Sequence, residues 1–104
     1  MNDVLINKKI SIERCVGQIQ KYYALESDLP FDKDHLRQDA IAMNLQRAVE
    51  LCIDSANHLV RRKKLGLPQE SRESFDLLNE AGLIEQERTN RLKAMVDFRN
   101  ILVH

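Results

Sequence analysis

The chain contains few of the residues that interrupt regular secondary structure. Its 104 residues include three glycines, two prolines and no tryptophan, and only 5% are aromatic. Tight hairpin turns depend on glycine and proline, so this scarcity nearly excludes an all-β sandwich. The length leaves no room for a second hydrophobic core, and we expect residues 1–104 to form a single domain.

Two further shortages exclude other classes of protein. Cys15 and Cys52 are too few and too far apart for a disulfide framework or a zinc motif, so we expect two buried thiols in a reducing cytoplasm. The longest uninterrupted apolar run is four residues, 40–43, which is too short for a transmembrane helix or a signal peptide. The sequence contains no glycine-rich phosphate loop and no metal-ligand spacing, and it therefore predicts no cofactor and no metal.

The chain also has no excess of charge of one sign. Sixteen Lys and Arg residues balance sixteen Asp and Glu residues. A domain that binds nucleic acid through its overall charge has a strongly basic pI, so any contact with RNA must come from a local patch.

Helical periodicity separated by short breaks dominates the sequence. We expect helices from Asp3 to a break at 27–34, and then over 34–64, 71–80 and 87–104. Asp32 or Asp34 can cap the second helix, and Gly66 and Gly82 should end the second and third. The first helix has one apolar stripe, formed by Leu5, Ile12, Val16, Ile19 and Tyr23. The pattern predicts an all-α antiparallel bundle of four to five helices. The last helix has no stop signal before His104, so we expect a C-terminus that is cut short.

The long second helix has apolar residues on an otherwise polar face. Met43 and Leu51 fall among Arg47, Glu50 and Asp54. One interpretation is scatter, because single exposed apolar residues are common. The other is that a second subunit or the last helix covers this face, with Arg47 as a partner for the buried carboxylates.

Four consecutive cations end the second helix: Arg61, Arg62, Lys63 and Lys64. The favoured interpretation is that they complement the negative end of the helix dipole and aid solubility. The alternative is a patch that steers phosphate groups.

The last six residues bring together groups that suit cleavage of RNA. On a helix, Asn100 and His104 stack on one face and Arg99 lies beside it. An imidazole transfers protons near neutral pH, and a guanidinium binds phosphate and offsets the charge of a transition state. The RNA supplies the nucleophile, its ribose 2′-hydroxyl. From the spacing alone, a helix-end Arg and His that complement the dipole remain the favoured interpretation.

The R-x4-H element of Arg99 and His104, with Asn100 after the arginine, resembles the signature of the HEPN superfamily. Segments 47–58, 65–68, 71–75 and 92–100 are similar to its HepT-like toxins, so the resemblance covers nearly the whole chain. It implies a HEPN fold and a metal-independent endoribonuclease, the toxin of a type VII-like toxin–antitoxin module. It also implies that Arg99 and His104 are catalytic and that Asn100 is a supporting residue.

The resemblance implies partners as well. Family members form two-fold homodimers in which the R-x4-H elements face one another, and a second copy supplies a second histidine as acid or base. Such a dimer would also account for Met43 and Leu51. The implied antitoxin is a small MntA-like nucleotidyltransferase that adenylylates a tyrosine two residues beyond the motif histidine. This sequence departs from that pattern because it stops at His104.

Two other functions stay open. The chain could be a non-catalytic helical module in which Arg99 and His104 line an interface with a nucleotidyltransferase, and zero net charge favours this by arguing against strong RNA affinity. A bundle that holds a small ligand is a weaker alternative, because the chain has no phosphate loop to support it.

Overall fold

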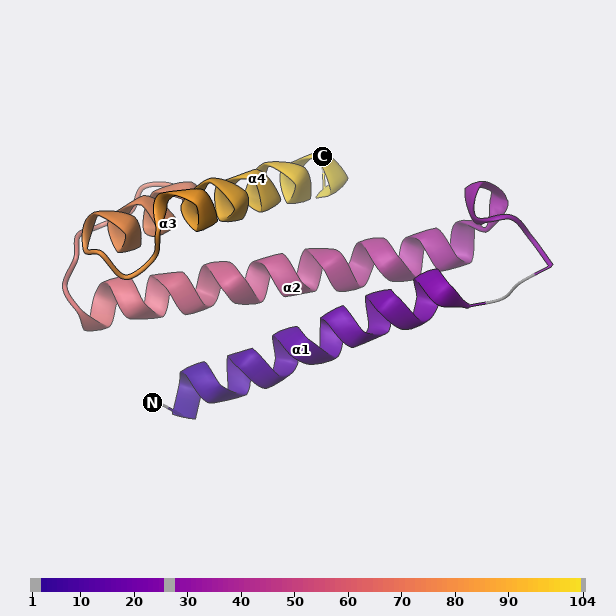
Figure 1. Ribbon diagram of the computed structural model, residues 1–104, viewed down its shortest axis with the longest axis horizontal. Helices are drawn as coiled ribbons and strands as arrows, with labels where there is room; N and C mark the ends of the chain where they lie inside the picture. The colour runs from indigo at the N-terminus through magenta and orange to yellow at the C-terminus, as the bar shows by residue number, and fades with distance from the viewer. Residues whose placement is uncertain (1–2, 26–27, 104) are drawn as a thin grey trace. The chain divides into compact units, whose positions relative to one another are not determined.

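The computed structural model describes residues 3–25 and 28–103, and the elements formed by these residues are helical. They are α1 (Asp3–Ala24), the 3-10 turn η1 (Phe31–Lys33), α2 (His35–Arg62), α3 (Ser71–Glu80) and α4 (Gln86–Val103), shown in Figure 1. No strand occurs within this part of the chain, and the predicted all-α fold is confirmed. Each helix begins within one residue of its predicted start. None of the described helices is long and apolar enough to cross a membrane.

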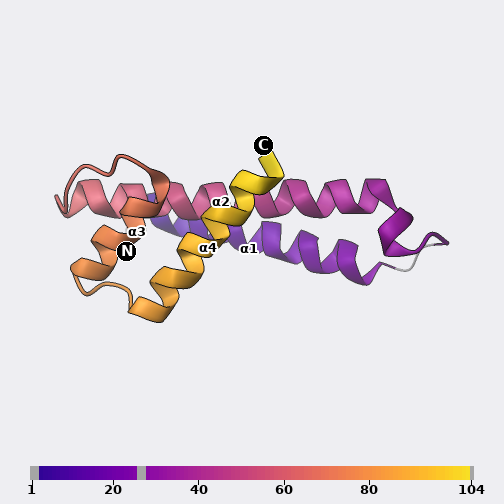
Figure 2. The same ribbon diagram turned by 90° about the horizontal axis from the view of Figure 1, so that it is seen from above.

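The chain divides into two compact units, and α2 contributes to both. The first unit extends to Leu51 and the second begins at Cys52. In the first unit, α1 and the first part of α2 run antiparallel (Figure 1). In the second, α3 and α4 pack against each other as a helical hairpin (Figure 2). A single domain over residues 1–104 stays a prediction.

The connection between α1 and α2 is held by a buried arginine. The side chain of Asp34 caps α2, as predicted, by accepting a hydrogen bond from the backbone N–H of Arg37 at 3.1 Å. The guanidinium of Arg37 lies 5.1 Å from the centre of the Phe31 ring and donates a hydrogen bond to the carbonyl of Leu25. These contacts fix the start of α2 relative to the end of α1.

Two helices end in a left-handed residue, and only one of these is a glycine. After α3, Gly82 has φ 77°, and the next amide bonds at 3.0 Å to the carbonyl five residues earlier. This Schellman geometry confirms the predicted stop. After α2, Lys64 has φ 53°, and the backbone N–H of Leu65 donates the equivalent hydrogen bond, also 3.0 Å long, to the carbonyl of Val60. The prediction that Gly66 ends α2 is therefore wrong, because the cap closes two residues before it.

The face that α1 presents to α2 also differs from the prediction. Cys15 is buried and Tyr22 is half-buried toward α2, whereas Tyr23 is 72% exposed and meets the Phe31 ring edge-on at 5.9 Å between centroids. The placement of Tyr23 in the core stripe is wrong. Val16 is also exposed, at 41%, whereas Leu5, Ile12 and Ile19 of the predicted stripe are half-buried. The less exposed side of α1 therefore keeps these three residues and has Cys15 and Tyr22 in place of Val16 and Tyr23.

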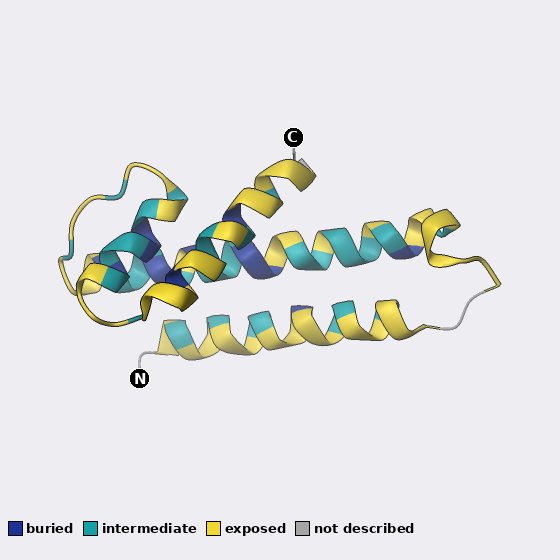
Figure 3. Cartoon of the chain, turned by 45° about the horizontal axis from the view of Figure 1, so that its top comes forward, coloured by how far each residue is buried: buried dark blue, intermediate teal, exposed yellow. Residues whose placement is uncertain are grey.

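Most of the buried apolar side chains belong to the second unit (Figure 3). They are Ile53, Ala56, Val60, Phe75, Leu78 and Val96. The α2 members recur at helical spacing, so one stripe of α2 joins the core that also holds α3 and α4. This core determines which faces of α3 and α4 remain for polar residues.

Candidate active site

A pocket of about 350 Å³ lies between the start of α3 and the second half of α4. Its lining residues are Glu70, Ser71, Arg72, Val96, Arg99 and Asn100. Two of the three predicted catalytic residues, Arg99 and Asn100, thus line one pocket. His104, the third, lies outside the described residues.

The geometry of α4 explains this placement. Val96 is only 2% exposed, and Arg99 and Asn100 follow it by three and four positions, so all three share one side of the helix. Arg99 is half-buried with its Nε atom inside the protein, and it makes a further interaction within the chain. Because Val96 is buried, the side of α4 that carries Arg99 is held beside the pocket.

The pocket has a local excess of positive charge in a chain whose net charge is zero. Two guanidinium groups, those of Arg72 and Arg99, oppose the single carboxylate of Glu70 among the lining residues. The Nε atom of Arg72 is 3.5 Å from a carboxylate oxygen of Asp97, and both side chains are about half exposed. Exposed ion pairs of this kind are weak, so Arg72 remains available to an anionic ligand.

A second pocket, of about 420 Å³, adjoins the first. Arg61, at the end of α2, and Leu67, in the connection to α3, line it, and it shares Glu70 and Ser71 with the first pocket. The other predicted phosphate-steering residues, Arg62, Lys63 and Lys64, are exposed and are not among its lining residues.

Polar contacts between helices hold this part of the fold. The hydroxyl of Ser74, which is fully buried, donates a hydrogen bond to the side-chain carbonyl of Asn57 and so joins α3 to α2. Lys93 of α4 donates to a carboxylate oxygen of Asp76 of α3 at 2.9 Å. Both contacts stabilise the helices that form the two pockets.

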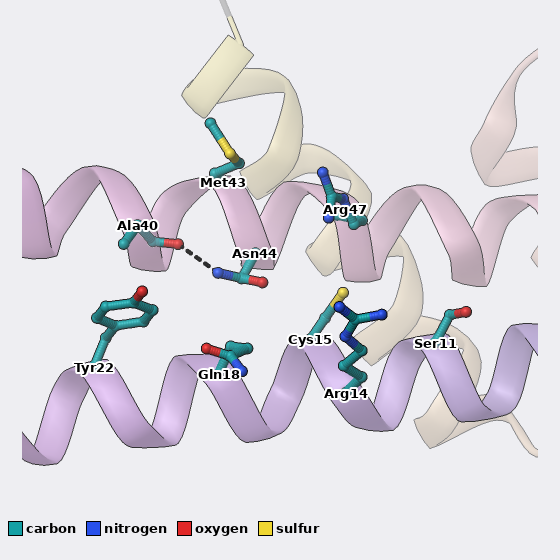
Figure 4. Close-up of a pocket in the computed structure, with 9 residues that line it drawn as sticks. All are labelled: Ser11, Arg14, Cys15, Gln18, Tyr22, Ala40, Met43, Asn44 and Arg47. Carbon is teal, nitrogen blue, oxygen red and sulfur yellow. Dashed lines mark hydrogen bonds between the residues drawn. The ribbon is translucent and has the colours of Figure 1, made fainter.

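Three of the predicted interface residues, Met43, Arg47 and Leu51, line pockets of the first unit. Met43 and Arg47 line a pocket of about 360 Å³ between α1 and α2, into which Gln18 and Tyr22 point (Figure 4). Leu51 is half-buried and lines another pocket, together with residues of the first half of α1. Met43 is 63% exposed and Arg47 is also exposed, so neither side chain is covered within the first unit. A second subunit or the last helix as the cover of this face stays a prediction.

The two predicted interface carboxylates are already engaged. Glu50 is half-buried in the first unit and Asp54 is exposed in the second, and each makes an interaction within the chain. A role for either residue in a dimer cleft stays a prediction.

The cysteines do not offer a nucleophile. Cys15 is buried, and burial raises the pKa of the half-buried Cys52 thiol above its ordinary value. A raised pKa keeps this thiol protonated, and the thiolate is the reactive form. Within the described residues, no cluster of three or more His, Cys, Asp or Glu side chains has the geometry to hold a metal ion.

The family model described as Ribonuclease HepT-like matches residues 12–104. The chain belongs to the HepT-like family. It is 49% identical over 104 residues to the mRNA nuclease HepT of Shewanella oneidensis, a match that covers all of this chain and 77% of the relative. The HepT-like resemblance stated from the sequence is thereby confirmed.

Solved structures agree with this membership. The tri-AMPylated HEPN toxin of Shewanella oneidensis in complex with MNT antitoxin superposes with a TM-score of 0.93 at 49% identity, over 100% of this chain and 77% of that one. A toxin–antitoxin crystal structure with AMP-PNP gives a TM-score of 0.92 at 48% identity, over 99% and 76% of the two chains.

The start of α3 contributes to the pocket of this HepT-like chain in a way that the sequence did not predict. Glu70, Ser71 and Arg72 line it, although only the similarity of segment 71–75 to the family drew attention to that region. The side of α3 that meets α4 depends on tertiary packing, and the charge pattern of so short a helix does not reveal it.

Proposed function

We propose that this HepT-like chain is a metal-independent endoribonuclease, the toxin of a toxin–antitoxin pair. The observation that carries the proposal is that Arg99 and Asn100 line one pocket with a local excess of positive charge. The R-x4-H spacing adds His104 as the proton-transfer group. The name of the Shewanella relative, an mRNA nuclease, supports RNA as the substrate.

In the proposed mechanism, the RNA supplies its own nucleophile. The 2′-hydroxyl attacks the adjacent phosphorus as an imidazole removes its proton, and the bond from phosphorus to the 5′-oxygen breaks. A protonated imidazole donates a proton to that leaving oxygen, which gives a 2′,3′-cyclic phosphate and a 5′-hydroxyl. Arg99 binds the phosphate oxygens and offsets the charge that builds up on them, and Asn100 offers an amide to orient the same group.

The RNA cleavage assay is run in excess EDTA. We expect cleavage to continue, because protonated and cationic side chains replace a metal ion in this mechanism, and the products should end in 2′,3′-cyclic phosphate. The control is a substrate with a 2′-deoxyribose at the cleaved position, which should stay intact. Cleavage that stops in EDTA and returns with a divalent cation would contradict the metal-independent mechanism.

We also propose that two copies of the chain assemble through the C-terminal half of α4. Phe98, Ile101 and Leu102 are all exposed there, next to Arg99 and Asn100, and Ile101 is 74% exposed. Neighbouring exposed apolar side chains of this size are typical of protein–protein contacts. A two-fold pair would supply two histidines to the reaction, one as base and one as acid.

The variant Ile101→Glu is expected to be monomeric and to cleave RNA poorly. Two-fold symmetry would bring the two introduced carboxylates into an apolar contact, where they lack partners. Analytical ultracentrifugation measures the mass, and Ile10→Glu, the same change at an exposed position of α1, is the control that should remain dimeric. A dimer that survives in Ile101→Glu would place the contact elsewhere.

The proposed antitoxin is an MntA-like nucleotidyltransferase, and the proposed location of the pair is the cytoplasm. Both similar solved structures are toxin–antitoxin complexes, and one contains MNT antitoxin with an AMPylated toxin. Co-expression with such a partner should yield a complex in which RNA cleavage is suppressed.

A further inference from the structure

The two pockets of the second unit adjoin at the start of α3 and together form what we call the α3 groove. The pocket that holds Arg99 and the pocket that holds Arg61 have Glu70 and Ser71 in common. The proposed cleavage reaction uses only the Arg99 end of this groove. The Arg61 end therefore needs an explanation of its own.

The Arg61 end combines the two kinds of surface that a nucleotide requires. Arg61 is exposed and brings a guanidinium group, which pairs well with phosphate. Leu67 is 86% exposed and, with Pro68, gives the same pocket an apolar wall against which an unstacked base can lie. Its volume, about 420 Å³, lies within the ~300–1,000 Å³ range of small-molecule sites.

The charges of the groove also favour an anionic strand. Three guanidinium groups, those of Arg61, Arg72 and Arg99, line it against the one carboxylate of Glu70. The whole chain is neutral, so this excess is local. Among the four consecutive cations at the end of α2, Arg61 is the one that lines the groove, and Arg62 beside it does not.

We propose that the Arg61 end of the α3 groove is a subsite for an RNA nucleotide that flanks the cleaved phosphate. Arg61 contacts a backbone phosphate of that nucleotide, and Leu67 contacts its base. The inference rests on the proposed ribonuclease function and adds to it a path for single-stranded RNA, whose unpaired bases are free to enter such a pocket.

The subsite should affect binding of a longer RNA and not the chemical step. With an unstructured RNA long enough to fill the groove, Arg61→Gln should raise KM roughly five- to tenfold, the size of one charge-assisted contact, and leave kcat unchanged. With a dinucleotide substrate, which cannot reach the subsite, the same variant should behave like the unmodified chain. Leu67→Asn should likewise raise KM for the long RNA and leave KM for the dinucleotide unchanged.

A substitution at Glu70 should change KM in the opposite direction. The carboxylate of Glu70 lies in the wall shared by both pockets and makes no side-chain cap to α3. Glu70→Gln removes a repulsion from the path of the strand and should lower KM for the long RNA severalfold. Arg62→Gln is the matched control, because it removes one positive charge from an adjacent exposed position outside the groove and should change KM much less.

Binding is measured separately from cleavage, by fluorescence anisotropy with a 2′-O-methyl RNA that cannot be cleaved. Arg61→Gln should reduce the slope of log affinity against log salt by about 0.7, the value for one phosphate contact on a single strand. If the unmodified chain binds this RNA in an Arg61-dependent way but cleaves none, the proposed ribonuclease function fails, and the Arg61 end remains an RNA-binding site without a cleaved phosphate beside it. If cleavage occurs and Arg61→Gln matches Arg62→Gln, the subsite is overturned and the ribonuclease remains. Unchanged RNA affinity together with weaker antitoxin binding in Arg61→Gln would assign the pocket to the protein partner and overturn the inference.

Discussion

Replacement of Arg99 by alanine is expected to lower kcat for RNA cleavage about 10²–10³-fold, the usual cost of removing one group that stabilises transition-state charge. Arg99 lines the pocket with its side chain half-buried, and a buried guanidinium loses little freedom when it binds a phosphate. Arg99→Lys should recover only part of the loss, because lysine retains the charge but not the two parallel hydrogen bonds. His104→Ala should cause a comparable loss through the missing proton transfer.

A matched control for this loss lies on the same helix. Arg88 is an exposed residue of α4 that does not line the pocket, so Arg88→Ala removes the same side chain without touching the site. Circular dichroism and thermal unfolding should show that Arg99→Ala remains folded. Cleavage by Arg99→Ala within threefold of the unmodified chain would exclude Arg99 as a catalytic residue.

The same variants separate the ribonuclease from a binding module. If the unmodified chain leaves every RNA intact and Arg99→Ala weakens the complex with a nucleotidyltransferase, Arg99 acts at an interface and the chain is non-catalytic. If Arg99→Ala keeps the complex and loses cleavage, the ribonuclease is supported and the binding-module hypothesis fails.

Phe75→Ala is expected to lower the free energy of unfolding by about 3–5 kcal/mol, the range for removal of a buried phenylalanine. Phe75 is 3% exposed and belongs to the core of the second unit. Domains of this size are stable by only about 5–15 kcal/mol, so this one change removes a large share of the stability. Loosening α3 should also disturb the pocket, because Ser71 and Arg72 lie one turn before Phe75.

Urea unfolding followed by circular dichroism measures the effect. The midpoint should fall while the dependence of the free energy on urea is unchanged, as expected for a cavity without a change in the unfolded chain. Phe75→Leu keeps most of the buried volume and should cost less than about 1.5 kcal/mol. A loss below about 1 kcal/mol in Phe75→Ala would mean that the core of the second unit is not closely packed around this ring.

The sequence alone determined the helices of this protein and the family to which it belongs. Helix starts, the Asp34 cap and the Gly82 stop were all predicted, because each depends on side chains within a few positions of one another. The HepT-like membership was also readable from the sequence, since the motif and the flanking segments extend over nearly the whole chain.

Tertiary structure alone decided which faces of those helices meet. The predicted stripe of α1 included Val16 and Tyr23, but packing left both exposed and buried Cys15 and part of Tyr22 instead. Packing likewise brought Arg72 beside Arg99 and separated Arg61 from the three cations that follow it. Hydrophobic periodicity is a property of a single helix. Which face of the helix is buried depends on the apolar area that each face can bury against helices distant in the sequence. The sequence of the helix itself does not contain that information.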